Sequence, residues 1–137
     1  MVLAVFSGRI IAPDPPAATD LLVSLEGFEN DHGMVLIALC DSRQDYESPD
    51  KAFRTIAAQV EQGSCKVVFD SLLAGEYAVK VYHDENGNGQ LDKNFMGIPI
   101  ENYGFSNNAR GTFGPPDWDA AKFSLPAQGD SIIIKIY

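Results

Sequence analysis

The sequence is poor in basic residues and in long apolar runs, and each shortage argues against a class of protein. Lys and Arg number 10 against 19 Asp and Glu, which gives a formal net charge of −9 at pH 7. A protein that follows a phosphate backbone needs a basic face, so we expect no nucleic-acid binding. No apolar run approaches the about 20 residues of a membrane-spanning helix, so we expect no membrane insertion either.

Histidine and cysteine are scarce as well, with 2 of each. Neither histidine has a second His or Cys at ligand spacing, which argues against a zinc site. Cys40 and Cys65 fit both a disulfide and two free thiols. The sequence also lacks a G-x-S-x-G motif and a phosphate-binding glycine loop ahead of a helix. We therefore predict a protein that is not an enzyme, with a hydrolase around His83 as the remaining catalytic alternative.

The length of 137 residues predicts one domain with a substantial core. We place the domain at residues 20–137. Residues 1–19 form a separate N-terminal segment, in which MVLAVFSGRII is a short strand or a remnant of cloning and APDPPAA is a proline-rich linker. The only basic residue of the segment, Arg9, follows its apolar run, so no signal peptide is visible.

Apolar residues recur with a period of two through the domain, which predicts β-strands. The expected strands are Leu21–Leu25, Met34–Cys40, Ala52–Val60, Cys65–Phe69, Tyr77–Val81, Ala121–Leu125 and Ile132–Ile136. We expect the first two to form a hairpin and the almost wholly apolar second one to be covered on both faces. Ala52–Val60 also fits a helical stripe, but the turn that follows favours a strand, and 41–51 reads as a polar loop. The pattern predicts an all-β, antiparallel, Ig-like sandwich of about seven strands.

The clearest chemical signal is the loop DENGNGQLD at residues 84–92, which follows the pattern D-x-N-x-N-G. Odd spacing in a curled loop turns side-chain oxygens inward, and a glycine at the sixth position permits the sharp turn. Oxygen ligands of this kind suit Ca²⁺. The predicted metal ligands are Asp84, Asn86, Asn88, Gln90 through its backbone carbonyl, and Asp92.

The loop is not an EF-hand, because Phe95 stands where an EF-hand has its bidentate Glu and a strand precedes the loop. Asp92, or a more distant acid such as Glu101 or Asp117, would have to complete the ligand shell. The alternative is a turn rich in Asn, Asp and Gly that only reverses the chain.

The segment 95–118 has no hydrophobic period and is rich in glycine and aromatic residues. A long irregular segment in a compact domain is often functional. One hypothesis is a carbohydrate or small-ligand groove, for which the candidate residues are Tyr103, Asn107, Asn108, Arg110 and Trp118. The alternative is that the aromatic rings plug one end of the sandwich. His83 shares parity with Tyr77, Val79 and Val81, so we expect it to point into the core.

The stretch 83–125, HDENGNGQLDKNFMGIPIENYGFSNNARGTFGPPDWDAAKFSL, resembles the core signature of the DUF2141 family of bacterial proteins. Upstream, LLVSLEGF, GMVLIALCDS and VVFDSLLAGEYAV resemble it too, so that the likeness covers residues 20–137. The resemblance implies a small β-sandwich of exported or cell-envelope proteins with no assigned activity. More loosely, the acidic loop is similar to the calcium loops of prealbumin-like (Cna-B-type) repeats at Asp84, Asn86, Asn88 and Asp92.

The family resemblance implies a cell-envelope or extracellular module, exported to the periplasm or beyond. In this hypothesis a Ca²⁺ ion in the acidic loop orders the adjacent long loop. A glycan or a protein surface is the expected partner.

Overall fold

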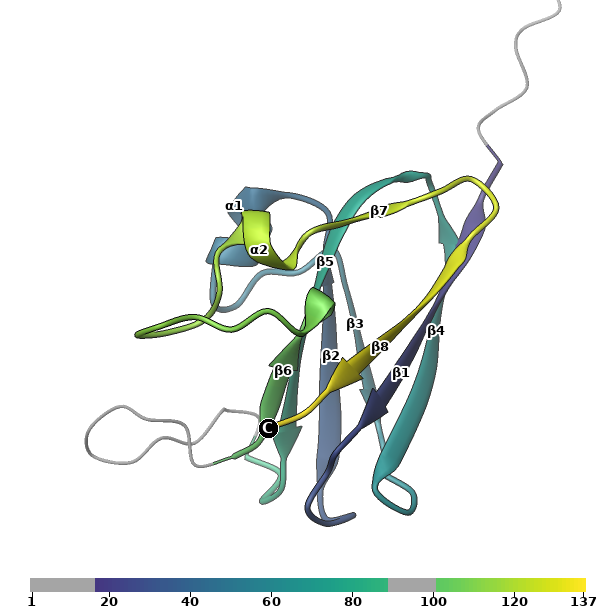
Figure 1. Ribbon diagram of the computed structural model, residues 1–137. Helices are drawn as coiled ribbons and strands as arrows, with labels where there is room; N and C mark the ends of the chain where they lie inside the picture. Colours follow the sequence, from purple (N-terminus) through teal and green to yellow (C-terminus); the bar gives the residue numbers. More distant parts are fainter. Residues whose placement is uncertain (1–16, 89–100) are drawn as a thin grey trace, which may run out of the picture.

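The computed structural model describes residues 17–88 and 101–137, and in this part the chain is mostly β-structure (Figure 1). The elements are β1 (Thr19–Glu26), β2 (Met34–Cys40), α1 (Arg43–Glu47), β3 (Arg54–Ala58), β4 (Ser64–Leu72), β5 (Gly75–Asp84), β6 (Tyr103–Phe105), a 3-10 turn (Ser106–Asn108), α2 (Trp118–Ala121), β7 (Phe123–Leu125) and β8 (Asp130–Lys135). The predicted DUF2141-like domain thus starts one residue inside β1.

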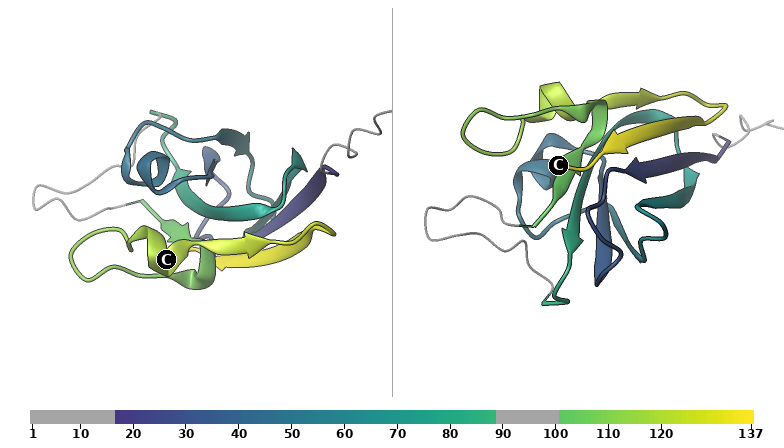
Figure 2. Two further views of the ribbon diagram at one scale, coloured as in Figure 1. Left: turned by 90° about the horizontal axis from the view of Figure 1, so that it is seen from above. Right: turned by 60° about the horizontal axis from the view of Figure 1, so that its bottom comes forward.

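The eight strands form two sheets that pack face to face, as the views in Figures 1 and 2 show. The smaller sheet has the strand order β4-β1-β8. The larger sheet has the order β3-β2-β5-β6, and β7 pairs with β5 as well. The prediction of a mostly-β protein is confirmed, with eight strands instead of about seven.

The core between the sheets is built by strict alternation along the strands. In β1 and β2 the fully buried side chains lie at every second residue, from Leu21 to Leu25 and from Val35 to Leu39. The period-two pattern predicted these faces, because successive strand side chains point to opposite sides. β2 is covered on both faces at its end, where Leu39 and Cys40 are both fully buried, as its apolar sequence indicated.

The predicted hairpin between the first two strands is wrong. β1 pairs with β4 and β8, whereas β2 pairs with β3 and β5, so the connection between β1 and β2 crosses from one sheet to the other. Gly27 begins this crossing with a φ of +91°, and a Cβ there would lie 2.9 Å from the Ile136 carbonyl oxygen. Alternation identifies the buried face of a strand but not its neighbour, which is why the sequence favoured the wrong partner.

The sheets are also not wholly antiparallel. β8 runs parallel to β1, with Leu21 opposite Asp130 and Leu25 opposite Ile134. Every other strand pair is antiparallel in the described residues. The last strand can join β1 in this direction because the chain from α2 through β7 returns to the end of the molecule where β1 begins (Figure 1).

Three segments that were predicted to be loops or strands contain other secondary-structure elements. The polar segment 41–51 includes α1, which Ser42 caps by accepting the Asp45 N–H with its side chain at 3.2 Å. The described part of the long segment contains β6 and the 3-10 turn and reaches the start of α2. Ala121, predicted in a strand, ends α2, whose cap is Asp117. These elements are each five residues or shorter, which is too short for a hydrophobic period to reveal.

The short helices cover the outer face of the larger sheet and make a second apolar cluster there. It consists of Cys40, Tyr46, Ala78, Phe105, Trp118 and Ala121. The Tyr46 hydroxyl donates to the Pro116 carbonyl at 2.6 Å, and Tyr46 packs edge-on against Trp118. Both cysteines are free, with Cys40 in this cluster and Cys65 in the core between the sheets.

No helix in residues 17–88 and 101–137 has the length and apolar character needed to cross a bilayer.

Candidate functional site

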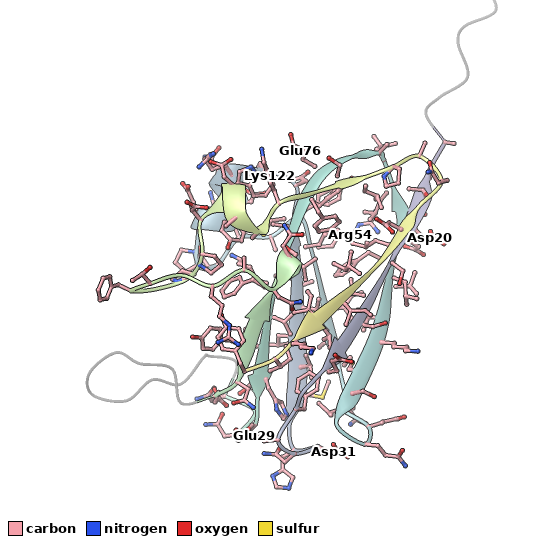
Figure 3. All side chains as sticks on the ribbon, in the orientation of Figure 1. Asp20, Glu29, Asp31, Arg54, Glu76 and Lys122 are labelled. Carbon is pink, nitrogen blue, oxygen red and sulfur yellow. The ribbon has the colours of Figure 1, made fainter. Side chains whose placement is uncertain are left out.

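The acidic loop leaves the end of β5, at the end of the molecule where β1 also ends and β2 begins (Figure 1). Asp84 is the last residue of β5, is only 3% exposed, and lies opposite Met34 in β2. The loop then turns through Gly87, which has a φ of +70°. Glu29 and Asp31 lie at this same end in Figure 3, so acidic side chains gather here from two connections.

The loop is closed by one backbone N–H that two side chains share. The Asn88 N–H donates to Asp84 Oδ1 and to Asn86 Oδ1, each at 3.1 Å. Positions 1 and 3 of the predicted motif therefore turn their oxygens toward the backbone of position 5. These two hydrogen bonds fit both the curled ligand loop and the alternative of a turn rich in Asn, Asp and Gly, and they bring Asp84, Asn86 and Asn88 onto one turn.

A second buried carboxylate, Glu101, lies beside this turn. The His83 N–H donates to the Asn102 carbonyl at 2.8 Å, which continues the pairing of β5 with β6 by one residue. Glu101 precedes Asn102 by one residue and contacts the residue after Asp84. Glu101 is 6% exposed and accepts the Glu85 N–H with Oε2 at 2.8 Å.

Besides burial, the carboxylates of Asp84 and Glu101 both raise the pKa of Tyr82. Burial is the main cause that raises the pKa of Tyr82, and the negative charges of Asp84 and Glu101 raise that pKa further. Asp84 and Glu101 therefore both place negative charge near the Tyr82 hydroxyl.

His83 lies on the other side of its strand, in the core, as its parity predicted. Its side chain is fully buried, its ring meets Phe28 edge-on at 5.2 Å, and Nε2 contacts the His32 carbonyl oxygen. Nδ1 lies 3.7 Å from Glu85 Oε1 and has no hydrogen-bond partner among residues 17–88 and 101–137. Glu85 also accepts the Asn30 side-chain amide at 3.2 Å, so it joins the two connections at this end.

The connection before β2 is fitted closely against the acidic loop. Gly33 has a φ of +63°, and a Cβ at this position would lie 2.0 Å from the Asp84 carbonyl oxygen and 2.7 Å from that of Glu85. Only glycine permits so close an approach of two backbones. The position of Asp84 therefore depends on a residue 51 positions earlier, and the contact of His83 Nε2 with the His32 carbonyl oxygen joins the same two segments.

Two of the predicted metal ligands, Gln90 and Asp92, lie outside the described residues. Of the more distant acids, Glu101 lies at the loop, whereas Asp117 caps α2 by accepting the Ala120 N–H at 2.9 Å. Across residues 17–88 and 101–137, no three His, Cys, Asp or Glu side chains are grouped to hold a metal ion. A site here would depend on Asn amide and backbone oxygens in addition to carboxylates.

The predicted groove residues of the long segment are separated by the fold. Trp118 is 7% exposed and lies inside the second apolar cluster. Asn107 Nδ2 donates to the Ala120 and Lys122 carbonyls at 3.1 and 2.8 Å, while Asn108 Oδ1 accepts the Lys135 N–H at 2.9 Å. Both Asn residues have positive φ, so their side chains hold a tight turn instead of facing an open groove.

Tyr103 and Arg110 are brought together through a residue that the sequence did not single out. The Arg110 guanidinium lies 3.6 Å from the centre of the Tyr137 ring, and that ring lies 4.7 Å from the Tyr103 ring. No sequence motif surrounds Tyr137. Its contacts with Tyr103 and Arg110 form because β6 and the chain after β8 lie side by side. The backbone N–H and C=O groups of Tyr103 and Tyr137 pair with each other there.

A family model described as an uncharacterized protein conserved in bacteria (DUF2141) matches residues 23–133, which is most of the chain. No curated protein and no solved structure matches the sequence.

Proposed function

The chain belongs to the DUF2141 family, and we propose that it is a non-enzymatic module whose loop from Asp84 binds Ca²⁺. In this proposal the two sheets form an Ig-like sandwich related to the prealbumin-like folds. The module acts in the cell envelope or outside the cell, and the ion fixes the end of the sandwich where the connections after β1 and β5 meet.

The observation that carries the calcium proposal is the Asn88 N–H shared by Asp84 and Asn86. It supports a loop already curled in the way that a D-x-N-x-N-G motif needs. Asp84 and Glu101, two buried acidic side chains at the same end, support a cation because they supply negatively charged oxygen ligands there. The ligands would be Asp84, Asn86, Asn88, Gln90 and Asp92, with Glu101 as the nearest further acid.

The burial of His83 supports the non-enzymatic part of the proposal. An imidazole that is fully buried between the sheets, with Nε2 on a backbone carbonyl, does not reach a substrate in solvent. A broad hydrolase screen tests this: activity that is lost in His83→Gln, with the melting temperature retained, would overturn it.

Calcium binding is tested by thermal unfolding in EDTA and then in millimolar Ca²⁺. A ligand at a hundredfold excess over Kd stabilises the folded state by ~2.7 kcal/mol, so the melting temperature should rise by several degrees. Mg²⁺ should give a smaller rise, because it requires a tighter octahedral shell.

Matched variants decide whether the rise comes from this loop. Asn86→Ala removes an exposed ligand and should abolish the rise with little change in EDTA, and Glu101→Gln should reduce it. Asp50→Asn, at an exposed residue after α1, should leave it intact. Equal melting temperatures with EDTA and Ca²⁺ in the wild type would contradict the proposal.

Carbohydrate binding is a second proposed function, favoured by the adjacent rings of Tyr103 and Tyr137, with Arg110 over the Tyr137 ring. Aromatic faces beside donors of hydrogen bonds are common in sugar sites. A glycan array with Arg110→Ala and Tyr137→Ala as controls tests it, and absence of any signal from the wild type would remove this candidate.

A further inference from the structure

The acidic loop contains an asparagine followed directly by a glycine, Asn86 and Gly87. An asparagine side chain can be attacked at its carbonyl carbon, Cγ, by the backbone nitrogen of the next residue, because the two atoms close an unstrained five-membered ring. A side chain on that next residue crowds the nitrogen, and glycine has none. Residues 86–88 are all exposed, so solvent reaches the pair.

The turn of the loop holds the Asn86 side chain in a position that favours this attack. Asn86 Oδ1 accepts the Asn88 N–H at 3.1 Å. This hydrogen bond spans the peptide group of Gly87, so the Asn86 side chain lies along the same stretch of backbone as the Gly87 nitrogen. Negative charge develops on Oδ1 as the nitrogen bonds to Cγ, and an N–H already directed at that oxygen stabilises the charge.

The surroundings of Gly87 leave room for the ring to close. No atom of the described residues lies within 4 Å of the place that a Cβ on Gly87 would take. Ring closure therefore meets no packed atom of the described chain on this side of the loop.

Asn30 is a matched control within the same chain. Its Oδ1 accepts the His32 N–H at 2.9 Å, so it makes the same hydrogen bond to the second residue along that Asn86 makes. The residue after Asn30 is Asp31, whose carboxylate accepts two backbone N–H groups of the connection between β3 and β4. A side chain anchored in this way crowds the Asp31 nitrogen and fixes it, and Asn30 should therefore remain intact.

We propose that Asn86 is a site of spontaneous deamidation. The Gly87 nitrogen gives its proton to solvent and bonds to Asn86 Cγ, the Cγ–Nδ2 bond breaks, and ammonia leaves with a proton from solvent. Water then opens the cyclic imide. Attack at Cγ gives aspartate, and attack at the main-chain carbonyl carbon gives isoaspartate. Both products exchange a neutral amide for a carboxylate.

The reaction changes the charge of the proposed calcium site, and this consequence rests on the proposed function. The aspartate product places a second carboxylate beside Asp84 on the turn that the Asn88 N–H closes. Calcium affinity of a ligand loop increases with the number of charged ligands. The isoaspartate product adds a methylene group to the backbone and so disrupts the ligand spacing. Deamidation thus alters the calcium affinity slowly and in one direction only.

Peptide mass mapping of the full chain, incubated in EDTA at neutral and at mildly alkaline pH, tests the modification. The mass gain of an amide-to-acid change should accumulate at Asn86 and not at Asn30. It should accumulate faster at the higher pH, because the nitrogen attacks without its proton. Gly87→Ala should slow the gain about tenfold, because its Cβ crowds the nitrogen. Asn86→Gln would need a six-membered ring and should show no gain at residue 86.

Three results would each overturn the proposal: no gain at Asn86, an equal gain at Asn30, or an unchanged rate in Gly87→Ala. Asn88 also precedes a glycine in the sequence, and fragment ions separate it from Asn86. A faster gain at Asn88 than at Asn86 would overturn the role of the Asn88 N–H.

Asn86→Asp separates the modification from the calcium proposal. This variant should show a larger calcium-dependent rise in melting temperature than the wild type. No rise in either protein would contradict calcium binding, while a mass gain at Asn86 would still establish the deamidation. Equal rises in the two proteins would overturn the effect of the new carboxylate on calcium affinity.

Discussion

The hydroxyl of Ser106 accepts the Val79 N–H at 2.9 Å and thereby fills a gap in the edge of β5. Along this edge β6 pairs with residues 80–82 and β7 with residues 75–77. Val79 lies between the two short strands, and no strand of the described chain pairs with it on this side. The same hydroxyl donates to the Ala121 carbonyl at 2.5 Å, so this side chain of the 3-10 turn joins β5 to α2.

Ser106→Ala should therefore destabilise the protein more than an ordinary surface change. Ser106 is fully buried, and its loss leaves the Val79 N–H and the Ala121 carbonyl without this partner. An unsatisfied buried group costs about 1–3 kcal/mol, which urea unfolding would measure. The matched control is Ser131→Ala, exposed on β8 and expected to change stability by less than about 0.5 kcal/mol. Equal effects of the two changes would contradict this role of Ser106.

Gly33→Ala should damage the end of the molecule that carries the acidic loop. Its Cβ would lie 2.0 Å from the Asp84 carbonyl oxygen, so one backbone segment must move. We expect a loss of more than about 2 kcal/mol in the free energy of unfolding, together with loss of any calcium-dependent stabilisation.

Gly87→Ala is the control for this change. Gly87 has a similar φ of +70°, but no atom of the described residues lies within 4 Å of the added Cβ. Its cost should be near the 1–2 kcal/mol of left-handed backbone alone. If Gly33→Ala and Gly87→Ala lower the free energy of unfolding equally, the close contact between Gly33 and Asp84 is not the cause of the loss.

Much of the fold could be predicted from period-two alternation, because the apolar positions of a strand determine which of its faces is buried. The prediction identified β1, β2, β3 and the inward direction of His83. It failed for strand partners and for the parallel direction of β8, since these depend on where connections such as that through Gly27 cross between the sheets. No local pattern records such a crossing.

In the candidate site, too, local features could be predicted from the sequence and contacts between distant segments could not. The curl through Asp84, Asn86 and Asn88 follows from spacing within one loop. The roles of Glu85 and Gly33 depend on contacts with a distant connection, and sequence spacing does not reveal them. Trp118 and Asn107 were candidates for a groove because aromatic and amide side chains suit ligands, but the same properties suit a buried cluster and a tight turn.

The two thiols should be reduced, unreactive in the folded protein and unable to pair with each other. Cys40 lies on the outer face of the larger sheet, and Cys65 lies in the core on its other face. Burial raises the pKa of each thiol, which lowers the thiolate fraction that reacts. A disulfide reagent at pH 8 should label both only after denaturant is added, with two thiols per chain in the absence of reductant. Fast labelling of the folded protein, or no thiol after unfolding, would contradict this.

Stability should fall at alkaline pH because the buried thiols and phenols resist ionisation. Burial is the main cause that raises the pKa of Cys40 above its usual 9.0, and of Tyr77 and Tyr82 above 10.0. A raised folded-state pKa means that the folded state holds its protons more tightly than the unfolded chain. The contribution to stability is therefore complete below about pH 9 and is lost as the pH rises through the folded-state values.

Urea unfolding from pH 7 to about pH 11 measures this loss, since each unit of raised pKa is worth about 1.4 kcal/mol. The free energy of unfolding should hold steady to near pH 9 and then decline. Tyr77→Phe should decline less steeply, because it removes one of the titrating groups while keeping the ring that packs near Phe53. A stability that stays level or increases above pH 9 would show that these groups ionise as readily in the folded protein as in the unfolded chain.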